Sequence, residues 1–299
     1  MDDLRALTAR IPLLADYDGP VERLGGLTNR VYRLGEYILR VPGAGTEDYI
    51  NRADEAIAAA EADRAGVGAR LLYADPDGGV MVTGFIDNAV TMTPALFKSR
   101  PGAVARAGAA FRRLHQSDAV FPTSFDLFRM IDDYLAILST KDVALPEGYH
   151  EILAEAEAVR IALAQRPLPQ VASHCDPLCE NFLDTGTRMW IVDWEYSGMN
   201  DPMWDLGDLS VEGGFDAAQD AALMQAYFEG TPPAADLGRM VIYKAMCDLL
   251  WTLWGLIQLA NGNPADDFRV WSDARFARCR ALMATDEFAR HLAAVHSGG

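Results

Sequence analysis

The sequence predicts an α+β fold in which a small antiparallel sheet with one helix precedes a larger, mainly helical region. Two pairs of short apolar segments, each joined by a turn, read as β-hairpins in the first part of the chain: 31–34 with 37–41, and 71–73 with 80–82. Beyond residue 86 most apolar residues recur at the three-to-four-residue spacing of helices. We therefore expect two lobes, 1–84 and 85–299, joined by a hinge at Thr83-Gly84-Phe85-Ile86.

The remaining elements follow from local signals. An alanine-rich helix is expected from Arg52 to Ala65, because Gly66 supplies a helix C-cap. A strand at 171–173 and a hairpin of 182–183 with 189–192 interrupt the later helices. His115, at the end of its helix, is expected to be structural. The further helices are expected at 101–115, 127–138, 151–164, 217–228, 237–260 and 271–284.

Composition narrows the function classes. The 299 residues carry a net charge of −17, which disfavours nucleic-acid binding and favours cationic substrates. The N-terminus lacks a basic start and an apolar core, and the longest apolar run, 245–260, is short for a bilayer. We expect a cytoplasmic protein without membrane insertion. The four cysteines, at positions 175, 179, 247 and 279, have the spacing of neither a disulfide framework nor a zinc site.

The pattern with the most chemical content is His174-Cys175-Asp176, followed by Asn181 and then by Asp193 at the end of an apolar run. Protein kinases use this spacing: the first Asp accepts the proton of the attacking hydroxyl, and the Asn and later Asp hold Mg²⁺. The hairpin between them returns Asp193 to the side of Asp176. The alternative is a solvated loop with an Asn-capped turn.

A second set of residues fits the phosphates of a nucleotide. Paired glycines precede Thr28 and Asn29, and such a loop lets backbone N–H groups approach an anion. Arg40 stands near the end of its strand, where kinases place a phosphate-binding lysine, and Glu55 is its expected partner. The G-x-G-x-x-G pattern is absent, and the same residues also fit an ordinary hairpin turn with a surface arginine.

Trp251 and Trp254 share one face of the 237–260 helix. Core packing is the default interpretation of such a stripe. The alternative is an aromatic cage, because tryptophan faces attract quaternary ammonium groups.

Together these residues resemble the choline/ethanolamine kinase family, a branch of the aminoglycoside-phosphotransferase-like kinases. The resemblance covers nearly the whole chain, with Pro177 and Cys175 as departures from the family pattern that touch no catalytic atom. The segments that carry it are 24–29, 37–43, 174–181, 193–212 and 251–258, the last being similar to the family's Trp-x-x-Trp helix.

The resemblance implies a bilobal protein-kinase-like fold and transfer of the ATP γ-phosphate to the primary hydroxyl of choline or ethanolamine. It implies Asp176 as base and Asn181 and Asp193 as Mg²⁺ ligands. The phosphates and adenine would be held by Thr28, Asn29, Arg40 with Glu55, and the backbone from Thr83 to Phe85. The ammonium group would be held by Glu195, Tyr196, Glu212, Trp251 and Trp254.

Two alternatives stay open from the sequence. A related kinase of thiamine or an aminoglycoside would use the same machinery, although paired tryptophans suit a polycationic aminoglycoside less well. A nucleotide-binding regulator without turnover would be expected to lack Asp176, Asn181 or Asp193, and all three are present. The sequence does not separate choline from ethanolamine.

Overall fold

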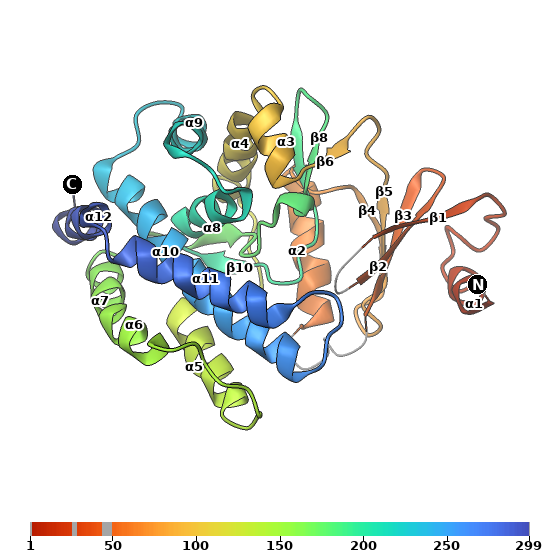
Figure 1. The fold of residues 1–299 in the computed structure, drawn as a ribbon. Helices are drawn as coiled ribbons and strands as arrows, with labels where there is room; N and C mark the ends of the chain where they lie inside the picture. Colours follow the sequence, from red (N-terminus) through yellow and green to blue (C-terminus); the bar gives the residue numbers. More distant parts are fainter. Residues whose placement is uncertain (1, 26–28, 44–49, 299) are drawn as a thin grey trace.

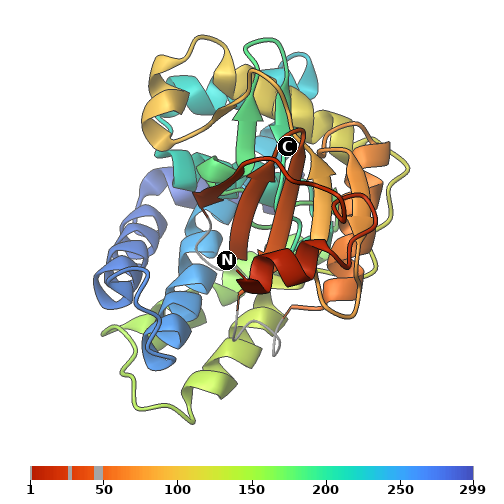
Figure 2. The ribbon, with the colours of Figure 1, turned by 90° about the vertical axis from the view of Figure 1, so that its right-hand side faces the viewer.

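A computed structural model describes residues 2–25, 29–43 and 50–298. The N-terminal part is an antiparallel sheet of order β1-β2-β3-β5-β4, and α2 lies between this sheet and the helical region (Figure 1). Helix α1 covers the opposite face of the sheet (Figure 2). The bounds are α1 Asp2–Thr8, β1 Val21–Gly25, β2 Asn29–Leu34, β3 Tyr37–Pro42, α2 Arg52–Arg64, β4 Leu71–Ala74 and β5 Met81–Gly84.

The alternation of side chains along β3 decides which residues face the future site. Leu39 and Val41 are buried in a small core on the outer face of the sheet, where they pack with Ile11 and other apolar residues. Their neighbours Ile38 and Arg40 point to the opposite face, because successive strand residues alternate. The two-residue turn before β3 uses Gly35 at φ +62°, a conformation that glycine adopts without steric cost.

The C-terminal part is mainly helical, with two small antiparallel sheets of order β10-β7 and β6-β8-β9. Its bounds are β6 Val90–Thr91, α3 Pro94–Ser99, α4 Ala103–His115, α5 Leu127–Leu138, α6 Tyr149–Glu155, α7 Glu157–Gln165, β7 Val171–Ser173, a 3₁₀ turn Cys179–Asn181, β8 Phe182–Asp184, β9 Met189–Ile191, β10 Gly198–Asn200, α8 Met203–Gly213, α9 Ala217–Phe228, α10 Ala234–Ala260, α11 Phe268–Met283 and α12 Asp286–Ser297.

Helix α10 forms the centre of the helical region, and α5, α8, α11 and α12 pack around it. Among the described helices it alone has the length and apolar composition of a membrane span, but 89% of that window is buried inside the protein. Burial on all sides is typical of the core helix of a large domain.

The predicted α+β architecture is confirmed, with an antiparallel sheet before a helical region. Strand β5 ends at Gly84, and the helical part follows it; the division into lobes at 84/85 stays a prediction. Helices at 127–138 and 217–228 have the predicted bounds. The predicted hairpin is present, with Phe182 opposite Ile191.

Other expected bounds were wrong. The 101–115 helix begins only at Ala103, because Gly102 before it takes a left-handed φ of +71°. The 151–164 helix is two, α6 and α7, although Ala156 between them keeps a helical backbone (φ −66°, ψ −12°). Strand β1, which pairs with β2, was not foreseen.

Candidate active site

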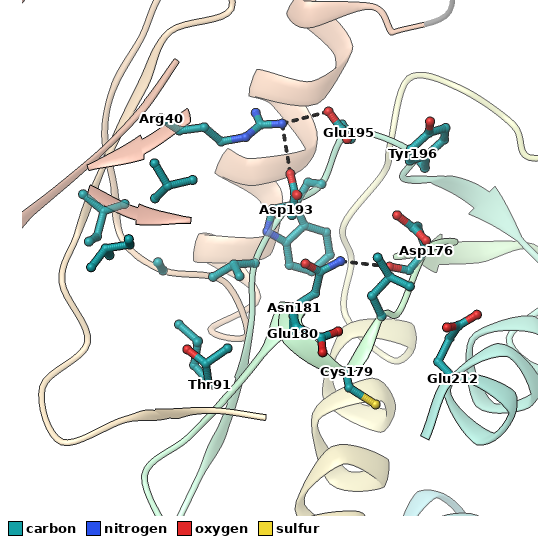
Figure 3. Close-up of a pocket in the computed structure, with 18 of the residues that line it drawn as sticks. Arg40, Thr91, Asp176, Cys179, Glu180, Asn181, Asp193, Glu195, Tyr196 and Glu212 are labelled. Atoms are coloured by element: carbon teal, nitrogen blue, oxygen red, sulfur yellow. Dashed lines mark hydrogen bonds and ion pairs between the residues drawn. The ribbon is translucent and has the colours of Figure 1, made fainter. Parts of the chain in front are cut away.

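A cleft of about 920 Å³ lies between the inner face of the sheet and the helical region. Its walls come from β2, β3 and β5, from the loop after β7, from the segment after β9, and from α8, α10 and α11. Asp176, Asn181 and Asp193 line its middle, so the three residues of the kinase-like pattern meet in one place (Figure 3).

Asp205 holds the loop that carries Asp176. This carboxylate has no exposed surface and accepts hydrogen bonds from the backbone N–H groups of His174 and Cys175, both at 2.8 Å. Cys175 itself has a left-handed φ of +68°, which a non-glycine residue adopts at a steric cost. Asp205 therefore holds the loop in its bent form.

Two histidines tie this loop to its surroundings. His174 is fully buried, and its Nε2–H donates to the Val192 carbonyl at 2.9 Å, next to Asp193. Burial lowers the pKa of His174, so the ring is neutral near pH 7. His115 lies 3.0 Å from Asp205 and 3.1 Å from the Tyr227 hydroxyl. His115 is structural, as expected.

The middle of the cleft has the donor set of a magnesium site. The Asn181 side-chain N–H donates to the Asp176 carbonyl at 3.0 Å, which orients the amide and leaves its oxygen to face a ligand. Burial raises the pKa of Asp193, so a bound cation would relieve the cost of this carboxylate. Amide and carboxylate oxygens are the ligands that Mg²⁺ prefers. The residues present thus fit the ion.

Asp176 has the electrostatic environment of a proton acceptor. Burial raises the pKa of its carboxyl group well above the ordinary value, and the charges of Glu212, Asp193 and Glu195 raise it further, while Arg275 opposes them. A raised pKa brings a carboxylate closer to the operating pH of a general base.

Arg40 lies at the centre of a charge cluster on the sheet side of the cleft. It forms an ion pair with Glu55, as predicted, and its Nη2 lies 2.9 Å from both Asp193 and Glu195 (Figure 3). Arg52 adds contacts to Glu55 at 2.8 Å and to Glu195 at 3.3 Å. Burial alone would lower the pKa of Arg40, but Asp193, Glu55 and Glu195 outweigh it and raise the pKa.

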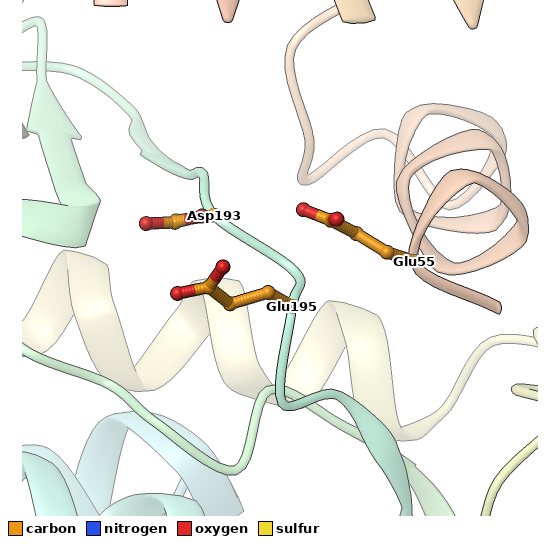
Figure 4. A group of neighbouring side chains, drawn as sticks. All are labelled: Glu55, Asp193 and Glu195. Atoms are coloured by element: carbon orange, nitrogen blue, oxygen red, sulfur yellow. The ribbon is translucent and has the colours of Figure 1, made fainter. Parts of the chain in front are cut away.

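Glu195 occupies a different part of the site from the one expected. Its carboxylate lies with those of Glu55 and Asp193, all within 4.8 Å of one another (Figure 4). Asn29 also donates to it, at 3.2 Å. Arg40 pairs with all three carboxylates and Arg52 with Glu55 and Glu195, so two positive charges face three carboxylates. Glu195 thus lies with residues that the sequence predicts to hold the nucleotide, whereas the sequence predicts Glu195 itself at the ammonium group.

The inner face of the sheet provides an apolar seat beside this cluster. Thr83 and Phe85 line it together with residues such as Ile38 and Met81. The Phe85 N–H already donates to the Glu36 carbonyl at 2.8 Å, so it is not available to a base. Thr28, also expected to contact phosphate, lies outside the described residues.

Aromatic side chains form the opposite half of the cleft. The Tyr196 and Trp251 rings are 5.6 Å apart, and the Trp254 indole N–H donates to the Tyr196 hydroxyl at 3.0 Å. Trp271 lies 5.6 Å from Trp254, and Phe268 is 5.7 Å from it. Glu212 projects from α8 at the edge of this aromatic half.

Several residues of the site were missed from the sequence. Arg52 carried a signal, since it precedes Glu55 by three residues on one helix. Phe268 and Trp271 carried none, because only the return of α11 along α10 brings them to Trp254. The same holds for Asp208, whose carboxylate accepts from the Trp251 indole N–H at 3.2 Å, and for Arg275.

Comparisons with known proteins agree with this geometry. Residues 21–240 match the model of the phosphotransferase enzyme family. A solved choline/ethanolamine kinase family protein from Mesorhizobium loti is 66% identical, with 99% of each chain covered and a TM-score of 0.94. The choline kinase LicA from Streptococcus pneumoniae is 26% identical, with 95% of this chain and 99% of that chain covered and a TM-score of 0.80. A probable ethanolamine kinase from Arabidopsis thaliana is 26% identical, over 80% of this chain and 72% of its own length.

The family match spans well over half of the sequence, and the Mesorhizobium relative covers nearly all of it. The fold, with an antiparallel sheet before a helical region, is also that of these relatives. The chain therefore belongs to the phosphotransferase enzyme family and, within it, to the choline/ethanolamine kinases, enzymes that act on an alcohol group.

Proposed function

We propose that this amino-alcohol kinase transfers the γ-phosphate of ATP to the hydroxyl of choline. The observation that carries the proposal is the division of one cleft by Asp176, with Arg40 and an apolar seat on one side and aromatic rings on the other. ATP would occupy the sheet side, and choline the aromatic side. The reacting oxygen and phosphorus would meet at Asp176.

In the proposed reaction Asp176 accepts the proton of the choline hydroxyl. The hydroxyl oxygen attacks the γ-phosphorus, and the bond from this phosphorus to ADP breaks. The raised pKa of Asp176 suits this role, because a base too acidic would bind the proton weakly. Asp205 fixes the loop, so the carboxylate is positioned before substrate arrives. Most of the rate enhancement in phosphoryl transfer comes from such positioning and from electrostatics.

Asn181 and Asp193 would hold Mg²⁺, which neutralises phosphate charge when bound. Arg40 now occupies the space between Asp193 and Glu195, held there by both carboxylates. With metal and nucleotide bound, we expect Nη2 of Arg40 to turn toward the phosphates while Nη1 keeps its ion pair with Glu55. We propose that adenine accepts a hydrogen bond from the Ile86 N–H rather than from the Phe85 N–H. The Ile86 N–H has no acceptor among the described residues.

Choline is favoured over ethanolamine by the state of the polar groups in the aromatic half. The Tyr196 hydroxyl already accepts from Trp254, and Oε1 of Glu212 already accepts from Arg275, so Glu212 offers a substrate cation one carboxylate oxygen, Oε2. A primary ammonium needs three hydrogen-bond acceptors, whereas a trimethylammonium needs none and is attracted by aromatic faces. The rings of Tyr196, Trp251, Trp254 and Trp271 offer those faces.

A methylation series of acceptors tests this proposal. We would measure ADP release with ATP and Mg²⁺ for ethanolamine, its mono- and dimethyl derivatives, and choline. We expect kcat/KM to rise along the series by about tenfold in total, since cation–π contacts contribute about 0.5–2 kcal/mol each. The matched control is 3,3-dimethylbutanol, which has the shape of choline without its charge.

We expect this neutral alcohol to be a poor acceptor. Equal or better turnover of ethanolamine would contradict the assignment of choline and leave the kinase reaction standing. Thiamine and kanamycin, added to the same panel, are expected to give no more ADP than the reaction without acceptor.

A further inference from the structure

Arg275 places a positive charge in the aromatic half of the cleft, the half that we propose binds a cation. The residue projects from α11 and is only 4% exposed. It lines the cleft together with Glu212 and Trp271. A buried guanidinium here would repel the substrate, so its presence needs a compensating role.

The contacts of Arg275 suggest that role. Its Nη2 lies 2.5 Å from Glu212 Oε1 on α8, and its Nη1 lies 3.2 Å from Asp248 Oδ1 on α10. The guanidinium carbon also lies 4.0 Å from the centre of the Trp271 ring. One side chain therefore touches a carboxylate wall and an aromatic wall of the same half-cleft, and it is fixed from behind by a buried aspartate.

Arg278, one turn further along α11, shows which of these contacts is specific. It also binds Asp248, at 2.7 Å and 3.0 Å, but its side chain is 53% exposed. Among the described residues Arg278 has no contact with Glu212 or Trp271, whereas Arg275 is the partner of the Glu212 carboxylate. Asp248 thus has two cationic partners, but Glu212 depends on Arg275.

We propose that Arg275 is a positioning residue for the acceptor, which holds the Glu212 carboxylate and the Trp271 ring as adjoining walls of the ammonium site. This inference rests on the proposed function. The planar guanidinium can donate to two carboxylates and stack on a ring at the same time, which an ammonium group cannot. Among the described residues Arg275 contacts Glu212 through Oε1, which leaves Oε2 to face the substrate cation.

The test compares Arg275→Met, Arg275→Lys and the matched control Arg278→Met. We expect Arg275→Met to raise the acceptor KM by about tenfold or more, the effect of losing one buried charge pair, and the ATP KM by less than about twofold. Arg275→Lys is expected to restore part of the loss, because it keeps the charge without the fork. Arg278→Met is expected to keep the wild-type KM for both substrates.

A second measurement does not depend on turnover. Choline titrated into the protein without ATP is expected to change the tryptophan fluorescence of wild type and Arg278→Met, with a Kd raised about tenfold in Arg275→Met. If Arg275→Met fails to fold, Arg275→Lys keeps a cation beside Glu212 and is measured in its place, with a Kd expected to lie above that of wild type.

A double-mutant cycle asks whether Arg275 acts through Glu212. We expect Arg275→Met to add less to the acceptor KM in a Glu212→Gln background than in wild type. Fully additive effects, or a folded Arg275→Met with unchanged acceptor KM and Kd, would overturn the inference. The KM and Kd ratios of variant to wild type are measured with the amino alcohol that the wild type phosphorylates best. A preference for ethanolamine would therefore contradict the choline proposal and leave the role of Arg275 open to the same test.

Discussion

Asp208 is a carboxylate buried beneath the aromatic half of the cleft. It has no exposed surface, and its Oδ2 accepts from Trp251 while Oδ1 has no hydrogen-bond partner among the described residues. Burial raises the pKa of Asp208 well above the ordinary value, and Glu212 and Asp176 raise it further. In the pH range between the ordinary and the raised value, the folded chain binds a proton that the unfolded chain has lost.

Wild-type stability is therefore expected to fall as pH rises through that range. Asp208→Asn has no such charge, and its amide oxygen can still accept from Trp251. We expect this variant to match wild type near pH 4 and to exceed it by about 1 kcal/mol or more at pH 8. Urea unfolding at several pH values measures the difference. A variant less stable than wild type at pH 8 would contradict the account.

At this scale the sequence predicted those contacts that depend on short loops. Asp176, Asn181 and Asp193 meet because one hairpin connects them, and Arg40 meets Glu55 because one helix follows its strand. The sequence did not predict that Glu195 lies on the sheet side of the cleft, because its partner Arg52 is more than a hundred residues away in the chain. The sequence around Arg275 contains no local signal that predicts its ion pairs with Glu212 and Asp248.

Helices α8 and α10 carry Glu212 and the two tryptophans, and Gly207 sets their separation. A Cβ at this position would lie 2.7 Å from the Met240 carbonyl oxygen and 3.2 Å from the Lys244 nitrogen, both backbone atoms of α10. Backbone atoms in the middle of a helix cannot move aside without moving the helix. The glycine therefore allows the close approach of the two helices.

Gly207→Ala is expected to cost about 2 kcal/mol of stability through overpacking, even though alanine favours helix. We also expect a higher acceptor KM for Gly207→Ala, because the added methyl group would push α8, and with it Glu212, away from α10. The control is Gly230→Ala, where the new methyl group would have its nearest neighbour at 4.0 Å. Urea unfolding measures the stability of both variants. Equal stability of Gly207→Ala and wild type would contradict the close-packing argument.

Elements were predictable where a strong local signal marked both ends. The 217–228 helix has a capping box at Asp216, and the 127–138 helix has Asp126 as its N-cap. Strand β1 escaped prediction, because its sequence, Val-Glu-Arg-Leu-Gly, gains strand character only by pairing with β2. Such pairing depends on tertiary context more than on propensity.

On the scale of the whole molecule, the sheet and the helical region are joined by charge across the cleft. Arg40 from β3 reaches Asp193 and Glu195 after β9, and Arg52 from α2 adds a further contact to Glu195. The order of elements along the chain predicted this two-part architecture. It did not predict that α11 would fold back along α10, which completes the aromatic half and brings Arg275 to it.

The central claim is that both halves of the cleft serve one transfer reaction at Asp176. Phosphorus NMR of a mixture of protein, ATP, Mg²⁺ and choline tests it directly, because it separates a phosphomonoester from free phosphate. We expect the wild type to form the ester of choline, and Asp176→Asn to form none while still binding ATP. Free phosphate in place of the ester, or ester formed by folded Asp176→Asn at the wild-type rate, would contradict the claim.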